Sequence, residues 1–161
     1  MSPIALRPIR PADDAELERV LVEVLAEFGA TGEGFSDQDA ELSAMSEAYG
    51  GPGAAYFVAL LDGSLVGGAG LGPLPGADPD TCELRKMYLL PSARGLGAGR
   101  RLVEICLEEA RRLGYRKCYL ETLAQMDRAR DLYERFGFLP LEAPMGDTGH
   151  FGCNRWYALS L

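Results

Sequence analysis

Residues 82–113 read CELRKMYLLPSARGLGAGRRLVEICLEEARRL, and this stretch decides the fold. Residues 82–90 predict a strand, and the proline and glycines of residues 91–99 predict a turn. A helix then runs to about Leu113, because apolar residues recur at helical spacing, at Leu102, Val103, Cys106, Ala110 and Leu113. A short strand at Lys117–Thr122 follows, so the stretch predicts a β-α-β unit.

The residues before this unit predict two helices and three further strands. The predicted elements are an edge strand at 4–9, a helix from about Asp13 to Phe28, a mobile loop at 29–36, a weaker helix from Asp37 to Tyr49 capped by Ser36, and two strands at Ala55–Leu61 and Leu65–Leu71. Asp62-Gly63 between the last two strands is a strong hairpin signal. Residues 72–80 predict a polar turn or loop.

The residues after the unit predict a helix at 127–136 that Gly137 caps, and two closing strands near Phe138–Leu141 and Asn154–Leu159. The predicted order is therefore β-α-α-β-β-β-α-β-α-β-β. Three antiparallel strands before a β-α-β unit predict an α/β (α+β) fold, with a mixed sheet of about seven strands and helices on both faces. The length of 161 residues predicts that positions 1–161 form one domain.

Composition excludes several classes of protein. No apolar run reaches the roughly 18–20 residues of a membrane span, and we see no signal peptide. The net charge of −8 argues against nucleic acid as a partner. The cysteines lie at 82, 106, 118 and 153 without a CxxC pair, and His150 is the one histidine, so we expect free thiols, no metal site and a cytoplasmic location.

Positive charge is concentrated in the segment from Arg85 to Arg101. This segment has no acidic residue and carries five cations, which are Arg85, Lys86, Arg94, Arg100 and Arg101. Arg100 and Arg101 fall in the first turn of a helix, where the helix dipole disfavours cations. This arrangement predicts an anion bound at that helix end by backbone N–H groups and arginines. The alternative is that the arginines are solvated and paired with Glu104 or Glu108.

The glycines of residues 94–99, Arg-Gly-Leu-Gly-Ala-Gly, support a phosphate site. Glycine allows a tight turn and a close approach of the backbone to a phosphate. The turn is not a P-loop, because no GK[ST] follows, and it is not the dinucleotide fingerprint, because position 100 is arginine.

Three segments resemble the GNAT superfamily of acetyl-CoA-dependent N-acetyltransferases. Residues 94–99 fit that family's [RQ]xxGx[GA] turn, residues 129–138 resemble its AxxLYxxxGF helix, and residues 83–89 resemble its central fourth strand. The resemblance covers residues 4–160 in element order and is motif-specific over 83–138. It implies a sheet whose two central strands splay apart, with acetyl-CoA bound in the opening as the co-substrate.

The resemblance also implies a set of binding residues. The backbones of Met87 and Leu89 would contact the pantetheine and the thioester. The turn at 94–100 would hold the pyrophosphate through Arg94, Gly95, Gly97, Ala98, Gly99 and Arg100. Where many members have an asparagine that contacts the coenzyme, this chain has Met126.

Two residues are candidate catalysts by the same resemblance. Glu83 matches a glutamate base that would take a proton from the amine. The alternative interpretation is that Glu83 is an ordinary strand residue paired with Arg85 or Lys86. Tyr133 matches a tyrosine that protonates the departing thiolate, and its alternative is a core aromatic. We interpret His150 as a solvated loop residue rather than a base, and no neighbour in sequence activates Cys153 as a nucleophile.

The sequence therefore predicts an enzyme that moves an acetyl group from acetyl-CoA to a primary amine in a ternary complex. The alternative is a non-catalytic acyl-CoA-binding sensor, which would keep the glycine turn without needing Glu83 or Tyr133. The amine, on a small molecule or a protein, is not readable from the sequence. The oligomeric state is open, and a homodimer is compatible with it.

Overall fold

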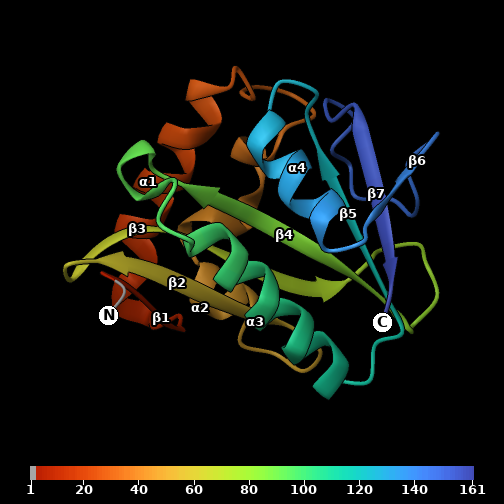
Figure 1. Cartoon of the computed structure of the whole chain (residues 1–161), viewed down its shortest axis with the longest axis horizontal. Helices are drawn as coiled ribbons and strands as arrows, with labels where there is room; N and C mark the ends of the chain where they lie inside the picture. The colour runs from red at the N-terminus through yellow and green to blue at the C-terminus, as the bar shows by residue number, and fades with distance from the viewer. Residues whose placement is uncertain (1–2) are drawn as a thin grey trace.

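A computed structural model of the chain describes residues 3–161, which form a seven-stranded sheet in the order β1-β2-β3-β4-β5-β7-β6 (Figure 1). The strands are β1 Ile4–Pro8, β2 Ala55–Leu61, β3 Ser64–Pro73, β4 Thr81–Leu89, β5 Lys117–Thr122, β6 Leu139–Leu141 and β7 Arg155–Ser160. The α-helices are α1 Asp14–Glu27, α2 Met45–Ala48, α3 Ala98–Arg112 and α4 Asp127–Arg135. The predicted order of elements and the edge position of the first strand are confirmed.

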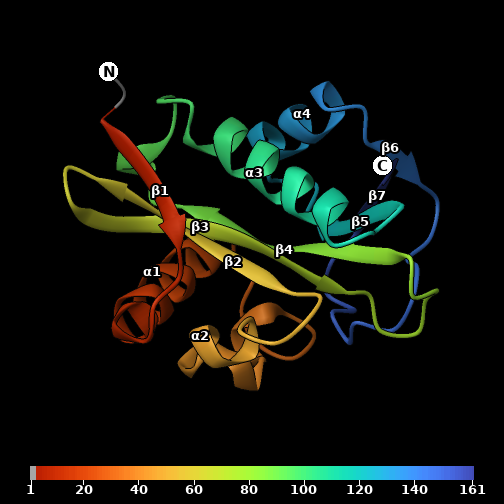
Figure 2. The same cartoon turned by 90° about the horizontal axis from the view of Figure 1, so that it is seen from below.

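Helices cover both faces of the sheet, as predicted. Figure 2 shows α1 and α2 below the sheet and α3 and α4 above it. The apolar stripe of α1 is fully buried, at Leu17, Val20, Leu21, Val24 and Leu25. The stripe of α3 is buried likewise, at Leu102, Val103, Cys106, Leu107 and Ala110. Within residues 3–161, every helix is too short or too polar to cross a bilayer.

The sheet is mostly antiparallel, and its one parallel pair among the described residues is β4 with β5. That pairing covers only Thr81–Glu83 and Lys117–Tyr119. Beyond Glu83, β4 continues along β3 to Leu89 while β5 continues along β7. The two central strands therefore splay apart after Glu83, which confirms the expectation from the family resemblance. We call this opening the wedge.

β4 contains a β-bulge where it pairs with β3. The register shifts between Gly68 and Gly70, and Lys86 has a φ of 48°, which is uncommon for a residue with a side chain. The Lys86 carbonyl accepts a hydrogen bond of 2.7 Å from the Tyr56 hydroxyl. This bond fixes the bulge from outside the β3–β4 ladder.

The prediction of one helix from Asp37 to Tyr49 is wrong. The segment instead holds two 3-10 turns, Ser36–Gln38 and Ala40–Ser43, before the short helix α2. The predicted cap, Ser36, is the first residue of the first 3-10 turn, and Phe35 is its N-cap. The helix is interrupted because Asp39 is extended, with φ −68° and ψ 129°, and its carboxylate contacts Lys86 Nζ at 2.7 Å. A long-range ion pair thus overrides a weak local helical preference.

Candidate functional site

The glycine turn ends at the N-terminus of α3, beside the wedge. Gly97 is the N-cap in a left-handed conformation, with φ 82° and ψ 4°, and Gly95 has φ 79°. The first N–H groups of an α-helix have no partner within the helix. A Cβ placed on Gly97 would have no heavy atom within 4 Å. The turn therefore presents the amides of Ala98, Gly99 and Arg100 beside open space, as an anion site requires.

The five cations of the segment all have partners within residues 3–161. Arg94 makes a bidentate ion pair with Glu27, both contacts at 2.7 Å, and donates to the Leu89 carbonyl. Arg100 pairs with Glu104 at 2.7 Å, as the alternative interpretation held, and Arg101 donates to the Ile4 carbonyl. Arg94 thus ties the end of α1 to β4, and the case for an anion rests on the amides rather than on unpaired charge.

The backbones of Met87 and Leu89 face the wedge. Gly68 is the partner of Tyr88 in the β3–β4 ladder, and the Leu90 amide donates to the Val66 carbonyl at 2.8 Å. Backbone polar groups of alternate residues point to opposite sides of a strand. The backbone polar groups of Met87 and Leu89, which alternate with those of Tyr88 and Leu90, therefore point away from β3, toward the space that β5 leaves.

Tyr133 lies in α4 among other rings of the core. It is 6% exposed, and its ring centroid is 5.8 Å from that of Phe138 and 6.3 Å from that of Tyr157. Burial raises its pKa, so the hydroxyl keeps its proton at neutral pH. The residue is thus a core aromatic in the cluster on which the β4 residues Met87 and Leu89 pack.

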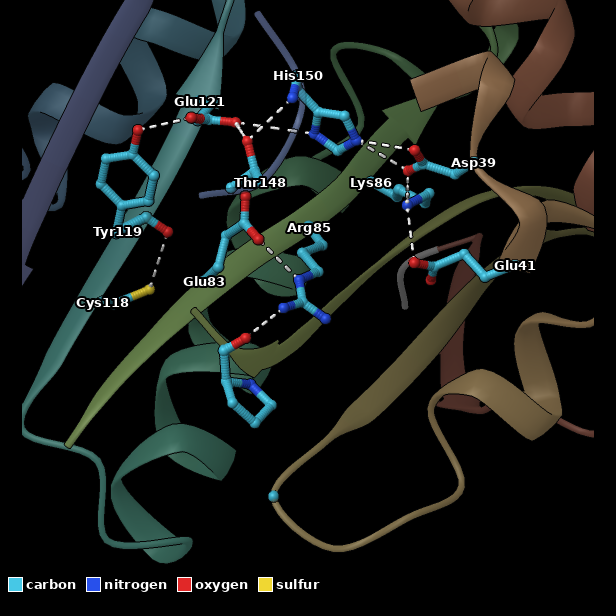
Figure 3. Close-up of polar contacts among 12 residues, drawn as sticks. Asp39, Glu41, Glu83, Arg85, Lys86, Cys118, Tyr119, Glu121, Thr148 and His150 are labelled. Carbon is cyan, nitrogen blue, oxygen red and sulfur yellow. Dashed lines mark hydrogen bonds and ion pairs between the residues drawn. The ribbon is translucent and has the colours of Figure 1, made fainter. Parts of the chain in front are cut away.

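Two buried carboxylates lie on the opposite face of the sheet from α3. Glu83 is the partner of Tyr119 in the β4–β5 ladder, and Glu121 is two residues further along β5, so Glu83 and Glu121 share a face. Their side chains are 6% and 5% exposed. Both line a pocket with Arg85, His150 and others (Figure 3), and the full lining is Ser36, Glu83, Leu84, Arg85, Lys86, Tyr88, Glu121, His150 and Cys153.

The surroundings move the pKa values of these two carboxylates in opposite directions. Burial raises the pKa of Glu83, and the nearby Glu121 adds to the rise, although Arg85 Nε donates to Glu83 at 2.8 Å. Burial also raises the pKa of Glu121, but the nearby His150 and the hydrogen bonds from Thr148 and Tyr119 outweigh burial and lower it. A pair with separated pKa values is typical of acid–base sites. Glu83 is the carboxylate better able to take up a proton.

The interpretation of His150 as a solvated loop residue is wrong. Its side chain is 16% exposed, and its Nε2 lies 2.9 Å from both carboxylate oxygens of Asp39. Its Nδ1 lies 3.7 Å from Glu121 Oε1. The hydrogen bond to Asp39 and the nearby Glu121 carboxylate raise the pKa of His150 to about 9. The imidazole is therefore a cation at neutral pH and is poorly suited to act as the base.

Sequence reasoning missed Asp39, Lys86 and Glu121 as members of this site. Lys86 is 3% exposed and contacts Asp39 at 2.7 Å and Glu41 at 3.4 Å. Glu121 was findable, because it lies on a predicted strand at a position that strand alternation places on one face with Glu83. Asp39 carried no such signal, since only the fold brings it to His150.

Three side chains of this pocket carry atoms of the kinds that bind metal ions. Glu83, Glu121 and His150 each offer one such atom, and the three atoms lie within 4.8 Å of one another. Because His150 Nε2 pairs with Asp39 and Arg85 Nε pairs with Glu83, we interpret the cluster as an ion-pair network.

Cys153 lines the same pocket as a thiol rather than a thiolate. Burial raises its pKa to about 12. The thiolate is the nucleophilic form. This agrees with the sequence argument against an acyl-cysteine.

Comparison with known proteins gives a consistent set of relatives. The model of the Acetyltransferase (GNAT) family matches residues 17–138. The uncharacterized N-acetyltransferase YjgM of Escherichia coli (strain K12) is 40% identical over 153 residues, which are 94% of this chain and 91% of that protein. An uncharacterized N-acetyltransferase of Schizosaccharomyces pombe is 33% identical, over 82% of this chain and 80% of that protein.

Solved structures share the fold. An acetyltransferase of the GNAT family from Staphylococcus aureus superposes with a TM-score of 0.81 at 20% identity, over 98% of both chains. A GNAT family acetyltransferase from Brucella melitensis, solved in complex with acetyl-CoA, gives a TM-score of 0.68 at 23% identity, over 98% of this chain and 87% of that one. At these identities the likeness concerns the fold.

Proposed function

Since the chain belongs to the acetyltransferase (GNAT) family and is thus an acyltransferase, we propose that it transfers the acetyl group of acetyl-CoA to a primary amine in a ternary complex. One observation carries the proposal: the wedge between β4 and β5 has the amides of α3 on one side of the sheet and the Glu83 pocket on the other. The Brucella melitensis structure, which binds acetyl-CoA, supports this choice of co-substrate.

Acetyl-CoA binds along the wedge in this proposal. The amides at the start of α3 hold the pyrophosphate, with Gly95 and Gly97 providing the turn. The β4 backbone at Met87 and Leu89 pairs with the pantetheine, and its N–H groups meet the oxygen of the thioester as negative charge develops there. Arg94 acts by fixing β4 and the turn to the end of α1.

The reaction needs a base and an acid, and Glu83 and Tyr133 fill these roles. The acceptor enters as an ammonium, and Glu83 takes one proton, directly or through water. The free amine nitrogen attacks the thioester carbonyl carbon, the C–S bond breaks, and the Tyr133 hydroxyl protonates the thiolate. The nitrogen loses a second proton to solvent as the amide forms, Glu83 returns its proton to solvent, and Tyr133 regains one proton from solvent. One turnover releases one proton, free CoA and the N-acetyl product.

The location proposed for this reaction is the cytoplasm. All four cysteines are free, at Cys82, Cys106, Cys118 and Cys153. Free thiols persist in reducing compartments.

The Gly97→Val variant tests cofactor binding. Saturating acetyl-CoA, at about 100 times its Kd, is expected to raise the Tm of the wild type by roughly 5–10 °C. Valine at this position places a branched Cβ beside the amides and in a left-handed backbone conformation that it rarely adopts. We expect the acetyl-CoA shift to disappear in this variant, as measured by thermal denaturation and calorimetry.

Gly114→Val is the matched control. Gly114 ends the same helix with φ +91° and equally open surroundings, so valine there adds comparable strain away from the wedge. This control is expected to unfold at a lower temperature yet keep the full acetyl-CoA shift. If Gly97→Val keeps it too, the phosphates bind elsewhere. Gly99 is less suitable for this test, because its Cβ would lie 3.2 Å from Leu132 Cδ2 and crowd α4.

A further inference from the structure

Two segments, residues 34–39 and residues 148–153, pack against each other beside the Glu83 pocket. The Gly152 amide donates to the Gly34 carbonyl at 2.9 Å. A Cβ on Gly34 would lie 2.6 Å from the Phe151 ring, and a Cβ on Gly152 would lie 2.6 Å from the Phe35 ring. Each aromatic ring therefore lies against the glycine of the other segment. We call residues 34–39 and 148–153 together the acceptor clasp.

The two halves of the acceptor clasp are also joined by charge. His150 Nε2 contacts both oxygens of Asp39 at 2.9 Å, and His150 Nδ1 faces Glu121 on β5 (Figure 3). Thr148 donates to Glu121 at 2.6 Å, which anchors the same half to the sheet. His150 thus contacts both the opposite half of the clasp and the floor of the pocket.

We propose that His150 is a positioning residue whose contacts with Asp39 and Glu121 hold the acceptor clasp over Glu83 and so set the affinity for the amine acceptor. The inference rests on the proposed function, because it assigns this pocket to the acceptor. It separates the two substrates: the clasp controls the amine, while the glycine turn at the start of α3 controls acetyl-CoA.

Charged groups from every neighbouring element face His150. Asp39 lies on the segment before α2, Glu83 and Lys86 lie on β4, and Glu121 lies on β5. Asp39 and Glu121 raise the pKa of His150, and burial and Lys86 lower it, with a net rise to about 9. The ion pair is complete below the ordinary histidine pKa of about 6.5 and is lost as the pH rises through about 9.

A titration of the imidazole tests the electrostatic half of the proposal without any acceptor. His150 is the one histidine in the sequence, so its carbon-bound proton gives an unambiguous NMR signal. In the full-length protein we expect a midpoint near 9. In Asp39→Asn the midpoint is expected to fall toward about 6.5. A wild-type midpoint near the ordinary value, or no change in Asp39→Asn, overturns the proposal.

The His150→Gln variant tests the positioning half. Glutamine keeps a hydrogen-bonding group but removes the charge. Hydrogen exchange is expected to speed up in residues 34–39 and 148–153, whereas protection of residues 94–101 by acetyl-CoA is unchanged. With the best amine of a primary-amine panel, the acceptor KM is expected to rise on the order of tenfold, the lower end of what losing a hydrogen bond to a charged group costs. The KM for acetyl-CoA and kcat are expected to stay near wild type.

These measurements separate failure of this inference from failure of the proposed function. Unchanged exchange in the acceptor clasp, or a loss confined to kcat, overturns the positioning role while acetyl transfer stands. A protein that shows the raised titration and the faster exchange but no transfer to any amine contradicts the proposed function, and with it the assignment of the pocket to an acceptor.

Discussion

Replacing Tyr133 with phenylalanine is expected to lower kcat roughly 10–10³-fold, in keeping with the contribution of a general acid. The ring contacts with Phe138 and Tyr157 remain, so packing is retained and only the hydroxyl is removed. Acetyl-CoA affinity is expected to stay near wild type, because the hydroxyl acts on the departing thiolate. Steady-state kinetics with the best amine of the panel, together with calorimetry of acetyl-CoA, measures both quantities.

Tyr157→Phe is the matched control for this variant. Tyr157 is 2% exposed and lies in the same aromatic group, but its hydroxyl contacts Arg130 at 3.4 Å. Its removal is expected to leave kcat within a few-fold of wild type. Equal turnover in Tyr133→Phe and Tyr157→Phe would return Tyr133 to the role of a core aromatic.

Replacing Glu83 with glutamine is expected to shift the pH–rate profile to higher pH and to lower kcat/KM at neutral pH by roughly 10²-fold or more. In the wild type, kcat/KM climbs with pH as Glu83, whose pKa burial raises, loses its proton and can accept one from the bound ammonium. Without the carboxylate the amine must lose its proton to bulk solvent, so activity recovers only near the amine's own pKa. Profiles of kcat/KM from acid to alkaline pH show the shift.

Glu121→Gln distinguishes the base from its neighbour. It removes a carboxylate of similar burial from the same pocket, but one that His150, Thr148 and Tyr119 keep ionised. Its ascending limb is expected to move to lower pH, because the Glu121 charge no longer raises the pKa of Glu83, and not toward the amine's own pKa. If Glu121→Gln shifts the profile to higher pH and Glu83→Gln does not, the roles of the two carboxylates are reversed. If neither shifts it, a water chain or His150 takes the role, and His150→Ala is the next variant.

Local patterns in the sequence were sufficient for most of the fold. The Asp62-Gly63 turn was predictable because its two residues tolerate positive φ, which they adopt at 49° and 85°. The helix α3 was predictable from its apolar spacing and from the glycines before it. In these elements the local sequence preference and the tertiary contacts favour the same conformation.

The acceptor side was less predictable, because long-range ion pairs determine it. The interruption of the helix expected from Asp37 to Tyr49 follows from Asp39 reaching Lys86 and His150, which lie 47 and 111 residues away. The single histidine looked like an exposed loop residue because its partners come from other segments. The five clustered cations suggested an unpaired positive patch, yet Arg94 finds Glu27 and Lys86 finds Asp39 only in the folded chain.

Amine-dependent release of CoA from acetyl-CoA tests the central claim most directly. The panel contains amino acids, polyamines, aromatic amines, and peptides with free lysines or N-termini, and free thiol is followed with mass spectrometry of the amine. We predict that at least one primary amine increases thiol release over the amine-free rate, gains one acetyl group, and does so far more slowly with Glu83→Gln. Binding of acetyl-CoA with no amine-dependent release across the panel would contradict acetyl transfer and favour a non-catalytic acyl-CoA sensor.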